Sequence, residues 1–596
     1  MLNAITQWLE ERTGLVGATR RLLASPVPGG PRWWNSLGFA LLSTLVVEAV
    51  TGILLSLTYS PGVGSAWGSV YYITHQMDGG WLVRGVHRFG SYAAVVLGGL
   101  WLLRLVLGGL YRAPREIRWW LALATFFLIL GLGVTGNILP WDQRGFWAAI
   151  VETTIAGGTP VVGPALKRLV VGGPELGNQT LTRVHALHVV ILPALLLVVG
   201  WLQARTMGRA WGDPERSAPS LATLWPAQAF YHASAASLAL GVVLALAVDN
   251  HGYSLDAPAE PSSEDYPARP EWYFLALNQL LKIFQGREFI ATLVIPGLAV
   301  SGLAALPLLD RVLPRKLSLG VASGFLIAIG LGLAGLTAAA VLKDSHSDAF
   351  RSARAKADRE AERAVSLATL GGIPPEGAAY LLKLDPLHRG NEVFEQRCAG
   401  CHDLGGDKRP EQWAPSLEGY GTYAWIRGLL DEPGSNRYFG KAPMCGGMAE
   451  WKEGSKLSSP ELDAVASFVA SFTAIPADVT PGEWLEDPKV RDHPGRKPYQ
   501  NECAGCHTMG DPKQRAKMLQ PAPDLWAWGS DRWTARMIQA PSHPSAYGYL
   551  EAEQKMPGFS DQLTDVDLRT LTRYLRGDYP RPVPPGPERS TARSHP

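Results

Sequence analysis

Seven long apolar runs constrain the fold of this chain more than any other feature of its sequence. Each is long enough for an α-helix to cross the hydrocarbon core of a bilayer, which takes about 20 predominantly apolar residues. Because a backbone in lipid must satisfy its own hydrogen bonds, the runs predict seven transmembrane helices. They cover about residues 36–58, 82–108, 119–138, 184–206, 226–248, 290–309 and 319–342.

Positive charge in alternate short loops sets the expected orientation in the membrane. Residues 59–81 contain no lysine or arginine, and Met1–Gly30 lacks the apolar segment and cleavage site of a signal peptide. We expect the N-terminus in the cytoplasm and residues 343–596 on the outer face of a bacterial inner membrane. The basic residues lie at Arg12, Arg20, Arg21, Arg32, Arg112, Arg115, Arg118, Arg205, Arg209, Arg216, Arg311, Arg315 and Lys316.

Positive and negative charges are nearly balanced over the whole chain. The chain of 596 residues has a formal net charge of +2, so no nucleic-acid partner is predicted. Residues 343–384 are charged and alanine-rich, which indicates a solvated helical linker. The proline-rich tail, residues 581–596, is predicted to be disordered.

Four of the five cysteines belong to two copies of one pentapeptide. Cys398-Ala-Gly-Cys401-His402 and Cys503-Ala-Gly-Cys506-His507 both have the Cys-x-x-Cys-His pattern of covalent haem c attachment. In this pattern the thiols bond to the porphyrin and the histidine ligates the iron. The pattern predicts two haems c, and the fifth cysteine, Cys445, is interpreted as a thiol without function.

Each haem c needs a second axial ligand later in the sequence. Met556 precedes a proline, an aromatic residue and a helical pattern, an order that resembles the distal loop of small cytochromes c. Earlier in the chain, Met448 has a similar spacing to a following helix, and Met444 is the alternative. We predict the pairs His402 with Met448 and His507 with Met556, each within its own stretch of sequence.

Two membrane helices carry histidine near their outer ends. His87 lies at the start of the second helix and His188 lies on the fourth. One imidazole from each of two antiparallel helices predicts a haem b site. His185, one turn from His188, could compete for the same iron.

Four segments of the membrane part carry a family resemblance. Gly80–Arg88, Leu139–Gln143, Thr180–Pro193 and Pro270–Phe274 resemble cytochrome b of the bc complexes, over about residues 30–342. The similarity is closer to the chloroplast type, in which a four-helix cytochrome b and a three-helix subunit are separate chains. The expected fold class is all-α, with a seven-helix transmembrane cytochrome b bundle followed by two small α-helical cytochrome c domains.

The resemblance implies a quinol site on the outer side. In the family the Pro270, Glu271, Trp272 and Tyr273 positions line the quinol-oxidation pocket. Glu271 would accept a proton from quinol, and Tyr273 would shape the pocket.

The resemblance also implies residues around the porphyrin. The glycines of the third helix, among them Gly136, would let a porphyrin approach the backbone. Arg84 would pair with a haem propionate, or else extend as an interfacial arginine. The other glycines are Gly131 and Gly133.

Both histidines that hold the inner haem in the family are missing here. Their positions correspond to Trp101 on the second helix and to Leu202 or Gln203 on the fourth. Tryptophan and leucine do not ligate iron, and glutamine is a poor substitute for imidazole. We therefore predict one haem b, on the outer side, and doubt a normal Q-cycle. Ser36 stands where the chloroplast type has a cysteine that binds an extra haem.

Two functions remain open from the sequence. The first is the redox core of a quinol-oxidising complex, with a separate Rieske iron–sulfur protein, an outer-face electron acceptor and a homodimeric assembly as implied partners. The second is an electron-relay or anchoring subunit of another respiratory assembly. The expected domains are 1–35, 36–210, 211–342, 343–384, 385–475, 476–580 and 581–596.

Overall fold

The computed structural model describes most of the chain. The described residues are 2–25, 27, 30–159, 162–207, 222–263, 265–405, 414–439, 446–510, 522–544, 546–547, 550 and 555–580. Met444, Cys445 and the tail from residue 581, about which the sequence led to expectations, lie outside them. The chain forms two compact units, one built on Met1–Ala379 and one on Tyr380–Pro585.

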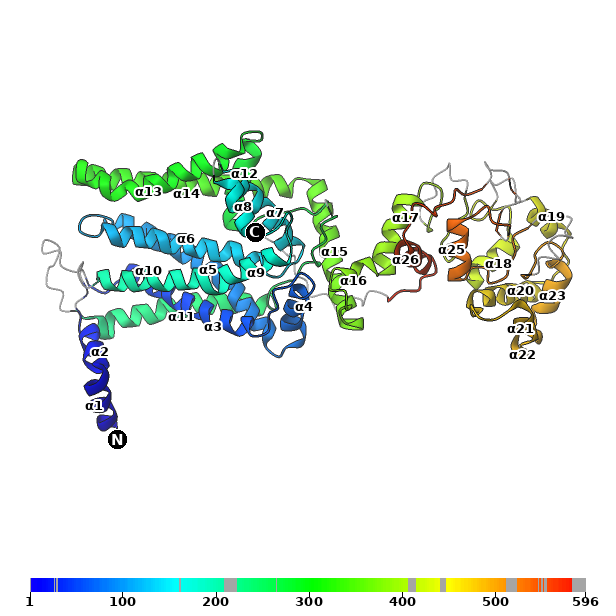
Figure 1. Cartoon of the computed structure of the whole chain (residues 1–596), viewed down its shortest axis with the longest axis horizontal. Coiled ribbons are helices and arrows are strands. Elements are labelled where there is room, and N and C mark those ends of the chain that lie inside the picture. The colour runs from blue at the N-terminus through cyan, green and yellow to red at the C-terminus, as the bar shows by residue number, and fades with distance from the viewer. Residues whose placement is uncertain are drawn as a thin grey trace. The chain divides into compact units, whose positions relative to one another are not determined.

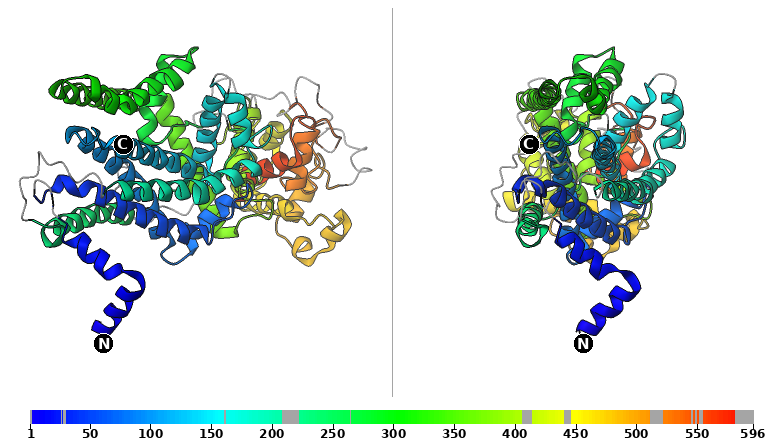
Figure 2. Two further views of the ribbon diagram at one scale, coloured as in Figure 1. Left: turned by 60° about the vertical axis from the view of Figure 1, so that its left-hand side comes forward. Right: turned by 90° about the vertical axis from the view of Figure 1, so that its left-hand side faces the viewer.

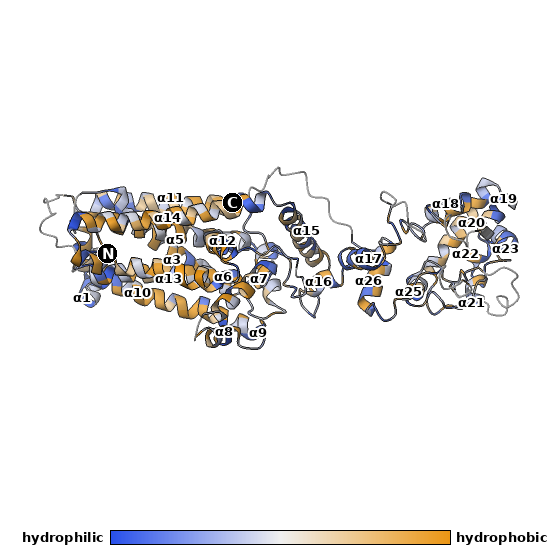
Figure 3. Ribbon diagram, turned by 90° about the horizontal axis from the view of Figure 1, so that it is seen from above, coloured by the Kyte–Doolittle hydropathy of each residue, from blue (hydrophilic) through white to orange (hydrophobic). Residues whose placement is uncertain are grey.

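The first unit is a bundle of long helices that run side by side (Figure 1). Within the described residues, seven helices are long and apolar enough to cross a membrane, which confirms the predicted number. Their apolar residues extend along most of their length (Figure 3), and the right-hand view of Figure 2 looks along them. The spans are Trp33–Ser56, Gly80–Leu107, Glu116–Ile138, Asn178–Thr206, Leu224–Asp249, Ile290–Val312 and Arg315–Ser345.

Helix α5 (Gly80–Leu107) lies at the centre of this bundle. It packs against α3 (Leu37–Ser56), α6 (Glu116–Ile138), α11 (Ala229–Asp249) and α14 (Arg315–Ser345). The fourth span consists of α9 (Asn178–Ala186), a π-helical turn (Leu187–Ile191) and α10 (Leu192–Met207), and α13 (Ile295–Val312) forms most of the sixth. No strand forms in the described part of the chain, where Asp142 and Pro258 make only an isolated bridge.

Short helices and loops cover one end of the bundle. They include α4 (Ala66–Tyr71), α7 (Gln143–Gly157), α8 (Gly163–Val171) and α12 (Leu275–Ile283). Asp142 caps α7 by accepting a hydrogen bond from the Gly145 amide at 2.9 Å. The Trp67 indole donates to the Asp256 carbonyl at 2.8 Å, so the segment after α11 is held against α4.

The charged stretch after the seventh span is not simply a solvated linker. It forms α15 (Asp348–Gly371), whose N-terminus is capped by Ser347. One stripe of this helix is buried, including Ala364 and Ala368. A hydrogen bond of 2.8 Å between the Tyr71 and Thr369 hydroxyls ties the helix to α4.

The second unit contains only helices and loops within its described part. Around the first Cys-x-x-Cys-His motif, α17 (Asn391–Arg397) packs against α26 (Asp565–Leu575), the last helix of the chain. Around the second motif, α23 (Arg496–Glu502) packs against α20 (Ser459–Ser471). The remaining longer helices are α18 (Tyr423–Asp431), α19 (Gly446–Gly454) and α25 (Asp531–Gln539).

Candidate haem and quinol sites

His87 and His188 face each other between α5 and the fourth span. Their ring centres are 6.3 Å apart and the rings are inclined by 79°. Two imidazoles that bind one metal from opposite sides, each at about 2 Å, have ring centres about 6 Å apart. The spacing therefore fits one iron between them. His185 stacks on Tyr59 instead, at 5.3 Å.

Each of these histidines is held by a threonine from a neighbouring helix. Thr51 Oγ1 lies 3.0 Å from His87 Nδ1, and Thr135 Oγ1 lies 3.0 Å from His188 Nδ1. Both hydroxyls already donate to backbone carbonyls, of Val47 and Gly131. They must therefore accept the Nδ1 proton, which leaves the Nε2 lone pair of each ring to bind iron.

Glycines lie beside both imidazoles. A Cβ atom at Gly52 would come within 3.2 Å of His87 Cε1, and one at Gly136 within 2.8 Å of His188 Cε1. The family resemblance implies that Gly136 lets a porphyrin approach the backbone. In the structure Gly136 lies beside the His188 imidazole. Gly133 faces the Tyr273 phenol, and Gly131 faces Leu192 at ordinary contact distance.

Arg84 donates to the backbone carbonyls of Tyr253 and Ser254, and to the Thr74 hydroxyl at 3.2 Å. It lies one helical turn before His87 on α5. Its pairing with a propionate stays a prediction.

The inner level of the bundle is filled by side chains. Trp101 is buried in an apolar cluster with Leu102, Leu105 and Ile129. Gly38 borders its indole, since a Cβ there would lie 3.1 Å from Nε1. Gln203 is buried and donates to Thr125 Oγ1 at 2.9 Å.

The Gly38–Trp101 contact repeats the Gly52–His87 contact one level inward. The interval from Gly38 to Gly52 on one helix equals the interval from His87 to Trp101 on the other. Where the outer level has an imidazole, the inner level has an indole within a packed core. These residues do not fit a second haem.

Glu271 lies in a buried polar site next to the histidine pair. Its carboxylate forms an ion pair with Arg88, the residue after His87, and accepts a hydrogen bond from the Tyr92 hydroxyl at 2.7 Å. Both Arg88 and Tyr92 are on α5. The sequence alone did not single out either residue, although the position of Arg88 directly after a histidine was a visible signal.

The rest of the Pro270–Phe274 segment packs on the same helix. Tyr92 contacts the rings of Trp272 and Tyr273, with centres 6.2 and 6.4 Å apart. Burial raises the pKa of the Tyr273 phenol, so it remains neutral and able to donate. Pro270 supplies no backbone donor and precedes Glu271 in extended conformation.

Glu152 on α7 is a second carboxyl group near Glu271. Burial, together with the negative charge of Glu271, raises the pKa of Glu152 to about 8. The sequence pattern did not indicate this residue, because nothing in the local sequence of α7 shows which side faces Glu271.

In the second unit, both motif histidines are oriented by a backbone carbonyl. His402 Nδ1 lies 2.9 Å from the Pro415 carbonyl, and His507 Nδ1 lies 3.0 Å from that of Pro523. The bond fixes the Nδ1 proton and leaves Nε2 for iron. Both rings fit the role of an axial haem ligand.

The motif cysteines Cys398, Cys401, Cys503 and Cys506 are free thiols. Burial raises the pKa of Cys398 to about 11 and that of Cys503 to about 12. Both groups are therefore protonated thiols at neutral pH. No group of three or more metal-ligating side chains occurs among the residues described. The two Cys-x-x-Cys-His motifs, with their oriented histidines, fit covalent haem attachment.

A membrane bundle with two opposed, tautomer-fixed imidazoles, joined to two Cys-x-x-Cys-His motifs, defines a membrane cytochrome with b-type and c-type parts. The family model described as Cytochrome b/b6/petB matches residues 23–206. The model described as Cytochrome c matches residues 387–473, and that of Cytochrome C oxidase, cbb3-type, subunit III matches residues 491–575. The chain belongs to the cytochrome b family and continues into cytochrome c domains.

Curated relatives agree with this assignment. Cytochrome b of Rhodobacter capsulatus is 31% identical over 310 residues, which is 49% of this chain and 70% of the relative. The menaquinol:cytochrome c reductase cytochrome b subunit of Bacillus subtilis is 37% identical and covers 33% of this chain and 91% of its own. Cytochrome b6 of Synechococcus elongatus is 32% identical and covers 35% and 98%. The chain is thus a multi-pass membrane protein of electron transport.

Proposed function

We propose that this chain is the quinol-oxidising cytochrome b/c subunit of a bc-type complex. It would take electrons from quinol at the outer side of the bacterial inner membrane and deliver them to two haems c on the periplasmic face. A Rieske iron–sulfur protein, an outer-face electron acceptor and a second copy of the complex are the proposed partners. The relatives named above are subunits of reductases or of the same cytochrome family, which supports this proposal.

The observation that carries the proposal is the ion pair between Glu271 and Arg88. Arg88 directly follows His87 on α5, so the ion pair connects the proposed quinol site to the helix that carries a proposed haem ligand. Oxidation of a quinol releases two protons and two electrons, so its site needs a base and nearby electron acceptors. The haems supply one-electron transfer when bound.

The chain's own residues supply the base and hold it in place. Glu271 accepts a quinol proton, since a carboxylate within hydrogen-bond reach can act as a general base. Tyr92 donates to that carboxylate and Arg88 pairs with it, so both position it. Trp272 and Tyr273 shape the apolar wall, and the raised pKa of Glu152 provides a protonated second carboxyl group nearby.

We further propose a single haem b, held by His87 and His188, and two covalent haems c. His402 and His507 are the proximal ligands of the two haems c, and Met448 and Met556 each supply the distal ligand of one of them. The packed Trp101 and the hydrogen-bonded Gln203 support the loss of an inner haem, because enlarging a filled core is costly. Without that haem, the family's inward route for the second electron is absent.

Quinol-driven reduction of the haems c tests this function. The purified complex, with its partner chains, is mixed rapidly with a quinol and the c-type absorbance is followed. We expect reduction that stops when a quinol-site inhibitor is added. Haems c that are reduced by dithionite but not by quinol would contradict the proposal and favour the relay or anchoring function.

The raised pKa of Glu152 leads to a pH prediction. An acid whose pKa is about 8 is protonated at pH 7 and loses its proton as the pH rises through 8. The new negative charge beside Glu271 should then hinder release of the proton that Glu271 has accepted, because a neighbouring like charge disfavours the ionised carboxylate. We expect quinol oxidation to decline above about pH 8 in the parent, and Glu152→Gln to remove that step. A decline unchanged in Glu152→Gln would assign it to another group.

A further inference from the structure

The two cytochrome c repeats, residues 385–475 and 476–580, do not pack as two successive domains. Each haem c needs its histidine and its methionine on one iron, so both must border the same cluster of side chains. The sequence pairs each motif with a methionine of its own repeat, Met448 in the first and Met556 in the second. The structure separates the members of these pairs and groups each motif with the other repeat's methionine.

One apolar cluster joins the first motif to Met556. Its buried members are Val393 and Phe394 of α17 together with Ile538, Leu568, Leu571 and Leu575 of the second repeat. Cys398 and Met556 both pack against this cluster, and Met448 does not belong to it.

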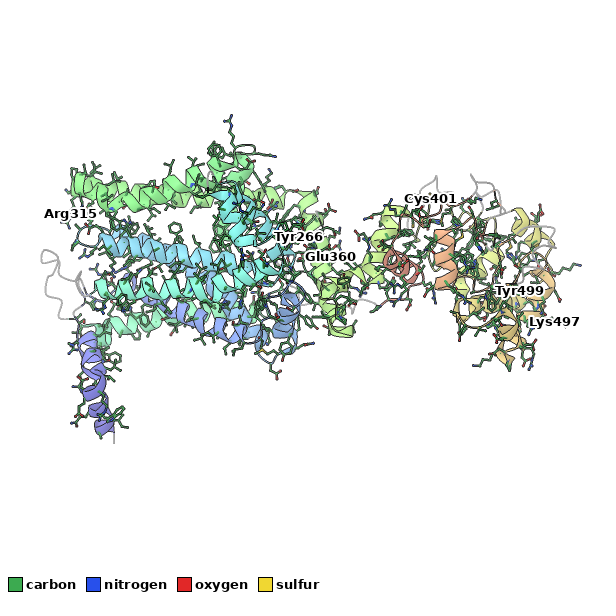
Figure 4. All side chains as sticks on the ribbon, in the orientation of Figure 1. Tyr266, Arg315, Glu360, Cys401, Lys497 and Tyr499 are labelled. Atoms are coloured by element: carbon green, nitrogen blue, oxygen red, sulfur yellow. The ribbon has the colours of Figure 1, made fainter. Side chains whose placement is uncertain are left out.

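Another cluster joins the second motif to Met448. Met448 and Trp451 pack against it together with Cys503 and Ala504, whereas neither Cys398 nor Met556 belongs to it. Its buried members come from both repeats and include Phe468 of α20 and Tyr499 of α23, whose ring centres are 5.5 Å apart. Figure 4 shows Cys401 and Tyr499 well apart within the unit.

Polar contacts hold the same exchanged arrangement. Arg389 Nε, before α17, donates to Asp567 Oδ1 of α26 at 2.7 Å. The Tyr574 hydroxyl of α26 donates to Asn391 Oδ1 of α17 at 2.6 Å. Next to the second motif, Gly495 lies directly against the Ala464 carbonyl of α20. A side chain at residue 495 would collide with that helix.

The chain passes from one apolar cluster to the other at equivalent glycines, Gly421 and Gly529. The same interval separates Gly421 from Gly529, Trp425 from Trp533 and Met448 from Met556, so the positions correspond between repeats. Gly421 and Gly529 both have positive φ, of 77° and 72°, and a Cβ on Gly421 would lie 3.5 Å from the Gly529 Cα. Only glycine adopts this conformation readily, and the two crossing segments of the chain touch there.

Main-chain hydrogen bonds mark where each chain segment leaves its Cys-x-x-Cys-His motif. The Leu417 amide still donates to Asp403 near the first motif, and the Leu525 amide to Thr508 near the second, at 2.8 and 2.9 Å. Beyond these residues α18 packs with α20, and α25 packs with α26. The first repeat therefore supplies its last helix to the second motif, and the second repeat supplies its own to the first motif.

We infer that the two haems c are held crosswise, which rests on the proposed haem c binding. Cys398, Cys401 and His402 hold one haem with Met556 as the distal ligand. Cys503, Cys506 and His507 hold the other with Met448. The inferred pairing differs from the pairs expected from the sequence, His402 with Met448 and His507 with Met556. Exchange of equivalent elements between two like units preserves every local contact, which is the basis of domain swapping.

Single-haem variants of the full chain test the pairing. Cys398→Ala with Cys401→Ala leaves only the haem at the second motif, and the sulfur-to-iron charge-transfer band of the oxidised haem then reports its distal ligand. We expect Met448→Ala to abolish this band and Met556→Ala to preserve it. In the reciprocal background, Cys503→Ala with Cys506→Ala, we expect the opposite.

Three outcomes would overturn the inference. The first is loss of the band, in either background, on replacement of the methionine from the same repeat as the remaining motif. The others are a band that survives both single methionine substitutions and a band that is lost with each of them. A parent protein without any covalent haem would instead overturn the proposed haem c binding. The two failures are therefore distinguishable.

A double-mutant cycle on the parent holoprotein gives a test that keeps all haem ligands. Asp567 is the third residue of α26 and caps it through Thr564, and Glu461 has the same role in α20 through Ser458. We expect Arg389→Gln to be non-additive with Asp567→Asn in the thermal midpoint, and additive with Glu461→Gln. Coupling of Arg389 to Glu461 instead of Asp567 would show successive domains and overturn the crosswise pairing.

Discussion

Replacing His188 with alanine is expected to remove all haem b from this chain while both haems c stay attached. Only one pair of opposed imidazoles exists at haem-binding spacing among the described residues, with ring centres 6.3 Å apart. A small side chain at residue 188 leaves one face of the iron without a ligand, and under the proposed function there is no inner site to retain a haem. The pyridine haemochrome b:c ratio should fall from near one to two in the parent to near zero.

The matched control is Gln203→Leu, at the inner level of the same helix. Gln203 bonds to Thr125 and has no proposed contact with a haem, so the b:c ratio should not change. Haem staining after denaturation should show colour bound to this chain in both variants. A parent ratio near one to one, or haem b remaining in His188→Ala, would show that a second site exists.

The Glu271→Gln variant should oxidise quinol about 100-fold more slowly or worse, as expected when a positioned general base is removed. The amide cannot accept the quinol proton. It also leaves the buried Arg88 guanidinium without its ion-pair partner. Haem content should be unchanged, since Glu271 bonds to neither histidine. Quinol oxidation by the purified complex, at saturating quinol, measures the effect.

Two further variants separate base chemistry from general disturbance. Glu288→Gln changes an exposed carboxylate and should leave turnover at the parent value. Tyr92→Phe removes one donor to Glu271 but keeps the carboxylate and its ion pair, so its loss should be well below that of Glu271→Gln. Parent-like turnover in Glu271→Gln would remove this residue from the mechanism.

The membrane fold was predictable because it depends on composition over long stretches. A run of about 20 apolar residues has few alternatives to a membrane helix, so the number of spans followed directly from the sequence. The charged stretch before the second unit was harder, because its helical pattern did not show that Ala364 and Ala368 would be buried against a partner.

The residues of the candidate sites also differ in how far the sequence could reveal them. Residues with specific chemistry, such as His87, His188 and Glu271, stand out because few other side chains ligate iron or accept a proton. Their neighbours do not stand out. Arg88, Tyr92, Thr51 and Thr135 are common residues whose importance comes from contact across helices, and no local pattern records that contact.

The sequence by itself determined which residues can hold haem, the number of membrane helices and the absence of imidazole at the inner level. Only the tertiary structure decided which methionine belongs with which motif. The two repeats are locally alike, so each last helix fits either motif, and the pattern of residues is the same for both arrangements. The choice depends on where the chain crosses at Gly421 and Gly529, and on long-range contacts such as Arg389 with Asp567.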